Sequence, residues 1–175
     1  MSYFSELERA MTFLGEKEDT FFIGQALIYD GTAQYKTCLN VPRNKIIEPP
    51  IWENTQLGMS IGMALTGKTI ISVFPRLNFL SCAMDQLSNH LDKISIYSNG
   101  EFKPKVIVRS SIGSVKPLNP QAQHRGDYTD GFKLFCPNMN IVRLDRTEDI
   151  FPAYEKAYLD DKPSLLIEWA DKLNG

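Results

Sequence analysis

Short, continuous runs of apolar residues recur along this 175-residue chain, and helical patterns lie between them. The clearest runs are TFFIG at 20–24, TIISVF at 69–74, KVIVRS at 105–110 and SLLIEW at 164–169. Because these runs do not alternate apolar and polar residues, each predicted strand is expected to be buried on both faces. Buried strands that alternate with helices predict an α/β fold, here a three-layer α/β/α sandwich with a mostly parallel central sheet.

The segments between these runs supply the expected helices. An apolar residue at every third or fourth position predicts an amphipathic helix over 2–15. Further helices are expected over 53–65, 78–97, 128–135 and from 147 to Pro163, with short strands at 46–47 and 140–144 and loops at 25–43 and 111–127. Neither a linker nor a repeat interrupts this order, so residues 1–175 are interpreted as a single domain.

Composition narrows the class of protein. The net charge is −2 and the basic residues are scattered, which argues against a nucleic-acid-binding protein. No apolar run approaches the roughly 20 residues that span a bilayer, so we expect no membrane segment. Cys38, Cys82 and Cys136 are odd in number and form no metal-ligand spacing, so no metal site is predicted. With no apolar signal core at the N-terminus, these cysteines indicate a reducing, cytoplasmic location.

One carboxylate precedes a run of unusually small residues. In EPPIWENTQLGMSIGMALTG, residues 48–67, Glu53 starts the predicted 53–65 helix, which contains two glycines and is terminated by Gly67. A carboxylate at a helix start is favourable through the helix dipole, and that is the simpler interpretation. The alternative is that Trp52 and the small-residue helix bury Glu53, in which case the carboxylate needs a partner or holds a proton.

Three other side chains are weaker candidates on their own. His124 lies in a polar loop, QAQHRGDY, where a histidine is most often solvated; a chemical role would need a cleft beside it. Phe79 starts the apolar face of the predicted 78–97 helix and fits a core position. Cys82, one turn later, fits ordinary packing. The chain contains no glycine-rich phosphate loop and no nucleophile-elbow pattern.

Four blocks, in order and in spacing, resemble the pyrimidine-binding domain of thiamine-diphosphate enzymes. The most similar members are the beta subunits of 2-oxoacid dehydrogenase decarboxylating components, and transketolase shares the domain more distantly. The blocks are PPIWENTQLGMSIGMALTGKTIISVF, NFLSCAMDQ, YSNGEFKPKVIVRSSIG and QAQHRG, and they cover nearly the whole chain.

The resemblance implies roles for the candidate residues. Glu53 matches the glutamate that hydrogen-bonds the cofactor aminopyrimidine and promotes ylide formation, which precedes attack on a 2-oxo acid. Phe79 matches the aromatic residue that stacks on the pyrimidine. Cys82, counted with Glu53 and Phe79 as cofactor-binding, stands near the presumed substrate side where relatives often have glutamine. His124 matches an active-site histidine that contacts substrate, although Arg125-Gly126 replaces the usual Ser-Gln. These departures leave the substrate class open.

The resemblance also implies that this chain carries half of a site. The family's magnesium- and diphosphate-binding motif is missing, because GDYTDG at 126–131 does not match it, and the usual C-terminal domain is not seen. We therefore expect Mg²⁺ and the diphosphate to be held by a separate subunit, most simply in a heterotetramer with self-association of this chain. The expected interface comprises 53–65, 78–97 and 111–127.

Several interpretations stay open at this point. The first is a subunit acting on a 2-oxo acid, by decarboxylation with acyl or aldehyde transfer, in the oxidoreductase or lyase classes. The second is a transketolase-like transferase acting on a ketose. A third is a non-catalytic structural or regulatory partner, although Glu53, Phe79 and His124 are all retained. A fragment of a longer beta subunit is a further possibility.

Overall fold

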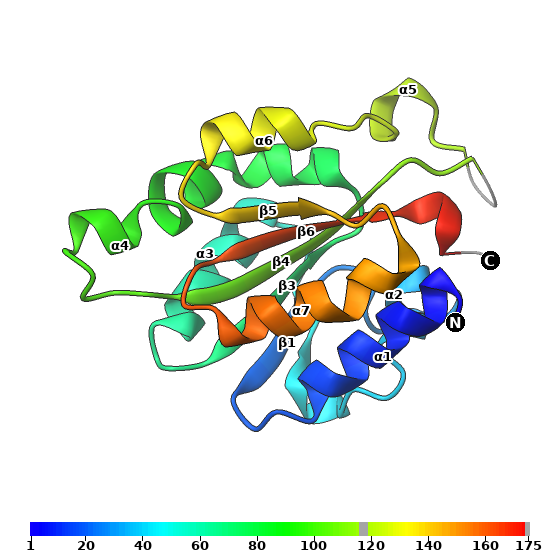
Figure 1. Cartoon of the computed structure of the whole chain (residues 1–175), viewed down its shortest axis with the longest axis horizontal. Coiled ribbons are helices and arrows are strands. Elements are labelled where there is room, and N and C mark those ends of the chain that lie inside the picture. Colours follow the sequence, from blue (N-terminus) through cyan, green and yellow to red (C-terminus); the bar gives the residue numbers. More distant parts are fainter. Residues whose placement is uncertain (116–118, 174–175) are drawn as a thin grey trace.

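Six parallel strands form one central sheet in the order β2-β1-β3-β4-β6-β5 (Figure 1). The structure is a computed structural model and describes residues 1–115 and 119–173. The strands are β1 Thr20–Gly24, β2 Ile46–Ile47, β3 Thr69–Phe74, β4 Lys105–Ile112, β5 Asn140–Arg143 and β6 Ser164–Trp169. The parallel sheet predicted from the apolar runs is confirmed.

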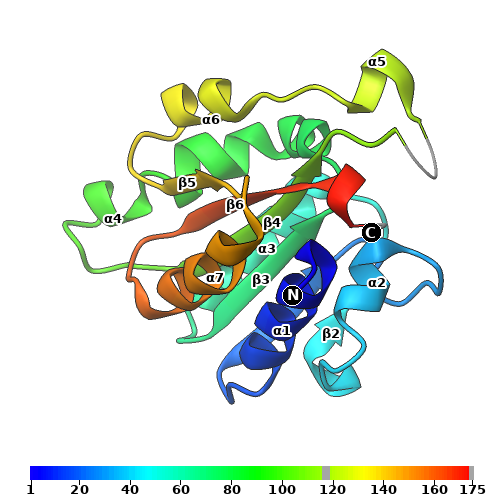
Figure 2. The same cartoon turned by 45° about the vertical axis from the view of Figure 1, so that its right-hand side comes forward.

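Helices cover both faces of the sheet, as Figures 1 and 2 show, which confirms the three-layer sandwich. The helices are α1 Tyr3–Gly15, α2 Ala33–Thr37, α3 Glu53–Ala64, α4 Ile94–Tyr97, α5 Gln121–His124, α6 Thr129–Phe135 and α7 Ile150–Leu159. Side chains of a strand point to alternate faces, so β3 sends Ile70 into one core and Ile71 into the other. Every residue of β3 is buried, as expected of a strand covered on both sides.

The two cores differ in the helices that build them. Leu7 of α1 and Tyr154 of α7 pack with Ile71 on one face. Leu57 of α3 and Phe132 of α6 belong to the core on the other face. Helix α1 has an N-terminal cap, because the Ser2 hydroxyl accepts a hydrogen bond from the Ser5 amide at 3.1 Å.

The prediction of a single long helix over 78–97 is wrong. The chain instead forms a 3-10 helix η2 over Leu77–Ala83, a π-helix η3 over Asp85–Leu91 and then α4. Ala83, Leu87, Leu91 and Ile94 of the expected apolar face are buried, so most of that face was recognised while the helix type was not. Changes of helix type are common at functional sites, and this one lies directly after β3.

The two expected loops also contain structure. The 25–43 segment includes α2, where the Thr32 hydroxyl accepts the Tyr35 amide at 3.1 Å as an N-terminal cap. In the 111–127 segment, β4 continues to Ile112 and α5 precedes residue 125. Residues 116–118 of that segment lie outside the described residues. The assignment of 1–175 to a single domain stays a prediction.

Within residues 1–115 and 119–173, no helix combines the length and the hydropathy that crossing a membrane requires.

Candidate active site

The candidate residues gather beyond the carboxyl ends of β1, β2, β3 and β4. Glu53 follows β2, η2 follows β3, and His124 lies on the segment that follows β4. In open α/β sheets, ligands bind in the crevice outside the carboxyl ends of the strands. The parallel topology therefore brings residues from four separate parts of the sequence to one edge of the sheet.

Glu53 is the first residue of α3 and is partly buried. Its Oε1 accepts a hydrogen bond from Gln25 Nε2 at 3.3 Å. Trp52 is 60% exposed, so the expectation that Trp52 buries this carboxylate is wrong. The Glu53 side chain is thus partly accessible to solvent, and Gln25 is the hydrogen-bond partner of its carboxylate among the residues that the structure describes.

The small residues of α3 face two directions. Ser60 is buried and its hydroxyl contacts Ser72 Oγ of β3 at 3.0 Å, so α3 packs closely on the sheet there. Gly62, in contrast, is exposed, and a Cβ at that position would meet no atom within 4 Å. The expected close packing is thus found on the inner face, while the outer face stays open.

Gln25 was missed by the sequence analysis, although it holds Glu53. It is 7% exposed and directly follows β1. The preceding residue must be small, because a Cβ on Gly24 would lie 2.3 Å from the Val73 carbonyl oxygen. The signal available in the sequence was a polar residue placed immediately after a buried strand that ends in glycine.

Glu48 is a second residue that the sequence analysis missed. Its carboxylate accepts the amides of Ala26, Leu27 and Ile28 at 2.9, 2.7 and 2.7 Å. Ala26 has φ +63°, a conformation that a residue with a side chain adopts only when its surroundings fix it. Glu48 therefore fixes the turn that follows Gln25.

The 3-10 geometry of η2 explains how Phe79 and Cys82 reach the site. A 3-10 helix has three residues per turn, so residues three apart lie on the same face. Leu77, Leu80 and Ala83 form its buried face. Phe79 and Cys82 share another face, on which Phe79 is partly exposed and Cys82 is exposed. The interpretation of Phe79 as a core residue is therefore wrong.

A cavity of 570 Å³ brings Cys82 to the start of α3. Its lining residues are Ile51, Trp52, Glu53, Asn54, Thr55 and Cys82. A second cavity, of 640 Å³, lies between η2, η3 and α6 and is bordered by Asn78, Met84, Tyr128 and Phe132, among others. The 570 Å³ cavity is the more polar site of the two in its reactive groups, because the Glu53 carboxylate and the Cys82 thiol both border it.

His124 lies against η2. The rings of His124 and Phe79 meet edge to face, with centroids 5.0 Å apart and an interplanar angle of 65°. Asn78 Nδ2 lies 2.8 Å from His124 Nδ1. With the amide nitrogen as donor, Nδ1 accepts and the neutral ring carries its proton on Nε2. Asn78 was missed, although it directly precedes Phe79 in the sequence.

The structure thus brings all four predicted residues to the same edge of the sheet as two pairs. Glu53 and Cys82 border the 570 Å³ cavity, and Phe79 and His124 contact each other. The 3-10 face that Phe79 shares with Cys82 connects the pairs. Among the described residues, no group of three His, Cys, Asp or Glu side chains is arranged to hold a metal ion.

Comparison with known proteins identifies the domain. Residues 1–174 match the family described as "Transketolase, pyrimidine binding domain". The pyruvate dehydrogenase E1 component subunit beta of Cyanidium caldarium is 28% identical over 158 residues, which are 89% of this chain and 47% of the relative. The mitochondrial subunit beta of Ascaris suum is 28% identical over 151 residues, which are 85% of this chain and 41% of that one.

A solved structure described as a split gene transketolase, inactive beta4 tetramer, has a TM-score of 0.67. It is 15% identical and matches 98% of this chain but 52% of its own, so this likeness concerns the fold alone. The chain spans less than half the length of either of these two curated relatives.

Proposed function

This chain belongs to the transketolase pyrimidine-binding domain family, and from that premise we propose that it is the pyrimidine-domain subunit of a thiamine-diphosphate enzyme. The observation that carries the proposal is the position of Glu53: a partly buried carboxylate beside a cavity, held by Gln25 at the carboxyl edge of the sheet. The cofactor supplies, when bound, the carbanion chemistry that reactions at a 2-oxo carbon require.

The residues present fit the pyrimidine end of this cofactor. A carboxylate with free acceptor capacity can share a proton with a weakly basic ring nitrogen, which is the role proposed for Glu53. Gln25 would keep the Glu53 carboxylate oriented, and Phe79 would provide the aromatic surface for the ring. Cys82, which borders the same cavity as Glu53, would line the cofactor side of the site.

His124 is proposed as the residue that contacts substrate. Its Nδ1 is engaged by Asn78, which leaves Nε2–H as the free donor of the neutral ring. A donor at this position can bind a carboxylate or a developing oxyanion of the substrate. The edge-to-face contact with Phe79 sets the plane of the imidazole ring.

The diphosphate and Mg²⁺ are proposed to be held by a separate subunit, in a heterotetramer that includes self-association of this chain. Support comes from the exposed apolar side chains along the expected interface: Met59 at 43% and Leu65 at 44%, with Leu134 at 84% on neighbouring α6. Gly62, on the outer face of α3, leaves room for a close backbone approach. Exposed apolar residues on one face are typical of association surfaces.

Action on a 2-oxo acid is the favoured reaction, because the two relatives described above are pyruvate dehydrogenase beta subunits. A transketolase-like two-carbon transfer is the second candidate, since the matched family takes its description from transketolase. The two reactions make the same demand on Glu53 and differ in what His124 and the partner subunit must bind.

Replacement of Glu53 by Gln tests the catalytic role. The tagged chain is co-purified with its partner, and turnover of pyruvate, branched 2-oxo acids and a ketose donor is measured with added cofactor and Mg²⁺. Loss of a general acid–base group is expected to lower kcat by about 10²- to 10⁴-fold. The control is Glu101→Gln, which changes an exposed carboxylate away from the site and should leave kcat unchanged. Full turnover by Glu53→Gln would contradict a catalytic role and favour the non-catalytic interpretation.

A further inference from the structure

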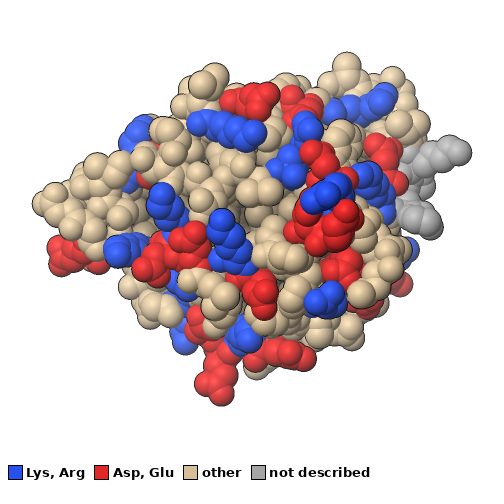
Figure 3. Space-filling view, viewed as in Figure 1, with Lys and Arg blue, Asp and Glu red and all other residues tan. Residues whose placement is uncertain are grey.

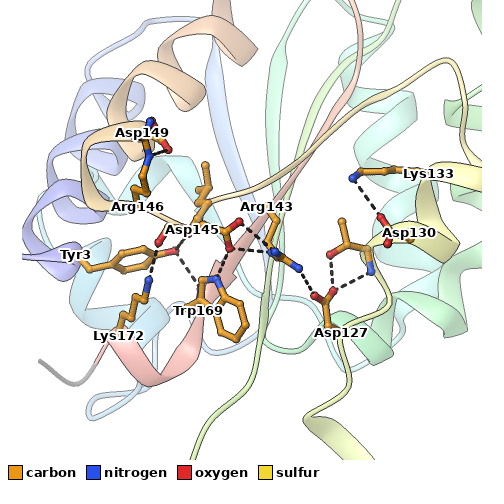
Figure 4. Close-up of polar contacts among 12 residues, drawn as sticks. Tyr3, Asp127, Asp130, Lys133, Arg143, Asp145, Arg146, Asp149, Trp169 and Lys172 are labelled. Atoms are coloured by element: carbon orange, nitrogen blue, oxygen red, sulfur yellow. Dashed lines mark hydrogen bonds and ion pairs between the residues drawn. The ribbon is translucent and has the colours of Figure 1, made fainter.

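The segment that carries His124 is attached to the sheet by an exposed carboxylate. Asp127 follows His124 by three residues and precedes α6. Its Oδ1 accepts the Thr129 amide at 3.0 Å, which fixes the start of α6. Its Oδ2 accepts Arg143 Nη1 at 2.6 Å (Figure 4). Asp127 thus connects the histidine segment to the last residue of β5.

Arg143 is itself held in a fixed orientation. Its Nε and Nη2 donate to the two oxygens of Asp145, at 2.8 and 3.1 Å, in a bidentate pair. Asp145 also accepts the indole N–H of Trp169 at 2.8 Å, and Lys172 Nζ donates to its carbonyl oxygen at 2.6 Å. We name Asp127, Arg143, Asp145 and Trp169 the Arg143 clasp; Figure 4 shows them as one continuous network.

The carboxylates of the Arg143 clasp stay ionised at neutral pH. Partial burial would raise the pKa of Asp127, but hydrogen bonds from Thr129 and Arg143 lower it below its ordinary value. Arg143 and Trp169 lower the pKa of Asp145. Because both pKa values are lowered, both aspartates are ionised at any pH above the ordinary pKa range of aspartate. The ion pairs are lost only as the pH falls through the lowered pKa values.

The other end of the same segment is also fixed. Asp171, just beyond β6, accepts the amides of Ser114 at 2.8 Å and Val115 at 2.5 Å. Arg76, just beyond β3, donates to the Gly113 carbonyl at 2.8 Å. Strands β4, β6 and β5 are neighbours in the sheet, so both attachments are made at the same carboxyl edge.

Only Arg125 and Gly126 separate His124 from Asp127. A Cβ on Gly126 would lie 2.4 Å from the ring of Tyr128, so the backbone passes directly against that ring. His124, on the near side, contacts Asn78 and Phe79 of η2. A shift of Asp127 would therefore be transmitted through two residues to the imidazole.

We propose that the Arg143 clasp is a positioning device for His124: Arg143, anchored by Asp145 and Trp169, holds Asp127 and thereby keeps the imidazole against Asn78 and Phe79. Its relevance to turnover rests on the proposed function, whereas its effect on the ring does not. Arg143 and Asp127 are 38% and 33% exposed, and exposed ion pairs contribute little to global stability. The geometry thus assigns the clasp a local role.

The test uses the two histidines of the chain, His90 and His124, as internal probe and reference. Ring resonances of the full chain are recorded by NMR for the wild type, Arg143→Gln and a matched control, Arg146→Gln. Arg146 makes a similar bidentate pair with Asp149 but does not contact the histidine segment (Figure 4). His124 resonances of Arg143→Gln should move to the positions of a solvated histidine, while those of His90 stay unchanged. Arg146→Gln should move neither.

Unchanged His124 resonances in Arg143→Gln would overturn the proposal. If Arg143→Gln does not fold, as judged by near-ultraviolet circular dichroism, Asp127→Asn decides, because it leaves the Arg143–Asp145 pair in place. The same His124 shift in Asp127→Asn supports the clasp, and its absence overturns it.

In the co-purified complex, Arg143→Gln should lower kcat about 10- to 100-fold, since displacement by about 1 Å has that effect on a reacting group. The KM for thiamine diphosphate should be unchanged. If Glu53→Gln abolishes turnover but Arg143→Gln leaves the His124 resonances unchanged, the proposed role of the Arg143 clasp is wrong and the proposed function stands. If Glu53→Gln keeps full turnover but Arg143→Gln shifts the His124 resonances, the proposed function is wrong and the role of the Arg143 clasp stands.

Discussion

At the scale of single residues, Cys82 offers the most direct probe of the site. It is exposed and borders the same cavity as Glu53, whereas Cys38 and Cys136 are buried. Burial raises the pKa of Cys136 to about 12 and also raises that of Cys38, so neither forms much of the reactive thiolate at pH 8. Iodoacetamide should therefore modify Cys82 first, as read by mass spectrometry of peptides.

Cofactor binding should then protect Cys82. Thiamine diphosphate added with Mg²⁺ to the co-purified complex is expected to slow its alkylation severalfold, because the cavity of Glu53 and Cys82 is then filled. Thiamine diphosphate without Mg²⁺ serves as the control. Equal alkylation rates with and without bound cofactor would place Cys82 outside the site.

The residues of the site were predictable to different degrees. Glu53 and His124 were recognised because each lies in a block that resembles a family motif. Gln25 lies outside these blocks and Asn78 begins one of them, yet neither was recognised, since each acts through one hydrogen bond whose partner is distant in the sequence. A contact across 28 or 46 residues leaves no local pattern, so it becomes visible only when the strands bring the two segments together.

At the scale of elements, a fully buried ion pair connects β4 and β6. Arg109 donates to Glu168 at 2.7 and 3.1 Å, and both side chains are 1% exposed. Tyr154 of α7 donates to the same Glu168 at 2.6 Å, and Cys38, which follows α2, lies 3.7 Å from Arg109. Burial alone would lower the pKa of Arg109, but Glu168 raises it, so the pair remains charged.

Removal of one charge from this pair should be strongly destabilising. Glu168→Gln leaves Arg109 buried without a counter-charge, which costs about 3–5 kcal/mol of the free energy of unfolding. Replacement of both residues in Arg109→Met with Glu168→Leu should cost much less, because no unpaired charge remains. Urea denaturation monitored by circular dichroism measures both. A loss below about 1 kcal/mol for Glu168→Gln would show that the buried arginine finds another partner.

The elements were largely predictable, and the exception has a physical reason. Strands β1, β3 and β6 begin and end where their apolar runs do, because strands covered on both faces admit few polar residues. The prediction for 78–97 was wrong because apolar residues at every fourth position, from Phe79 to Leu91, are typical of an amphipathic α-helix. The change of helix type depends on the packing of η2 against α3 and the sheet, which no local pattern encodes.

At the scale of the whole molecule, charged side chains are unevenly distributed over the surface. Figure 3 shows basic and acidic side chains interspersed over the face that carries α1 and α7, whereas the end at α4 is largely uncharged. Ile96 and Tyr97 of α4 are 59% and 58% exposed, and Phe135 of α6 is 63% exposed. These exposed apolar side chains add to those on the outer face of α3, and such residues are typical of association surfaces.

The central claim is that this chain holds the pyrimidine half of a site whose diphosphate half lies on another subunit. Isothermal titration of thiamine diphosphate with Mg²⁺ into the chain alone, and into the co-purified complex, tests it most directly. We predict weak binding to the chain alone and tight, magnesium-dependent binding to the complex, with one cofactor per copy of this chain. Tight, stoichiometric, magnesium-dependent binding by the chain alone would contradict the account.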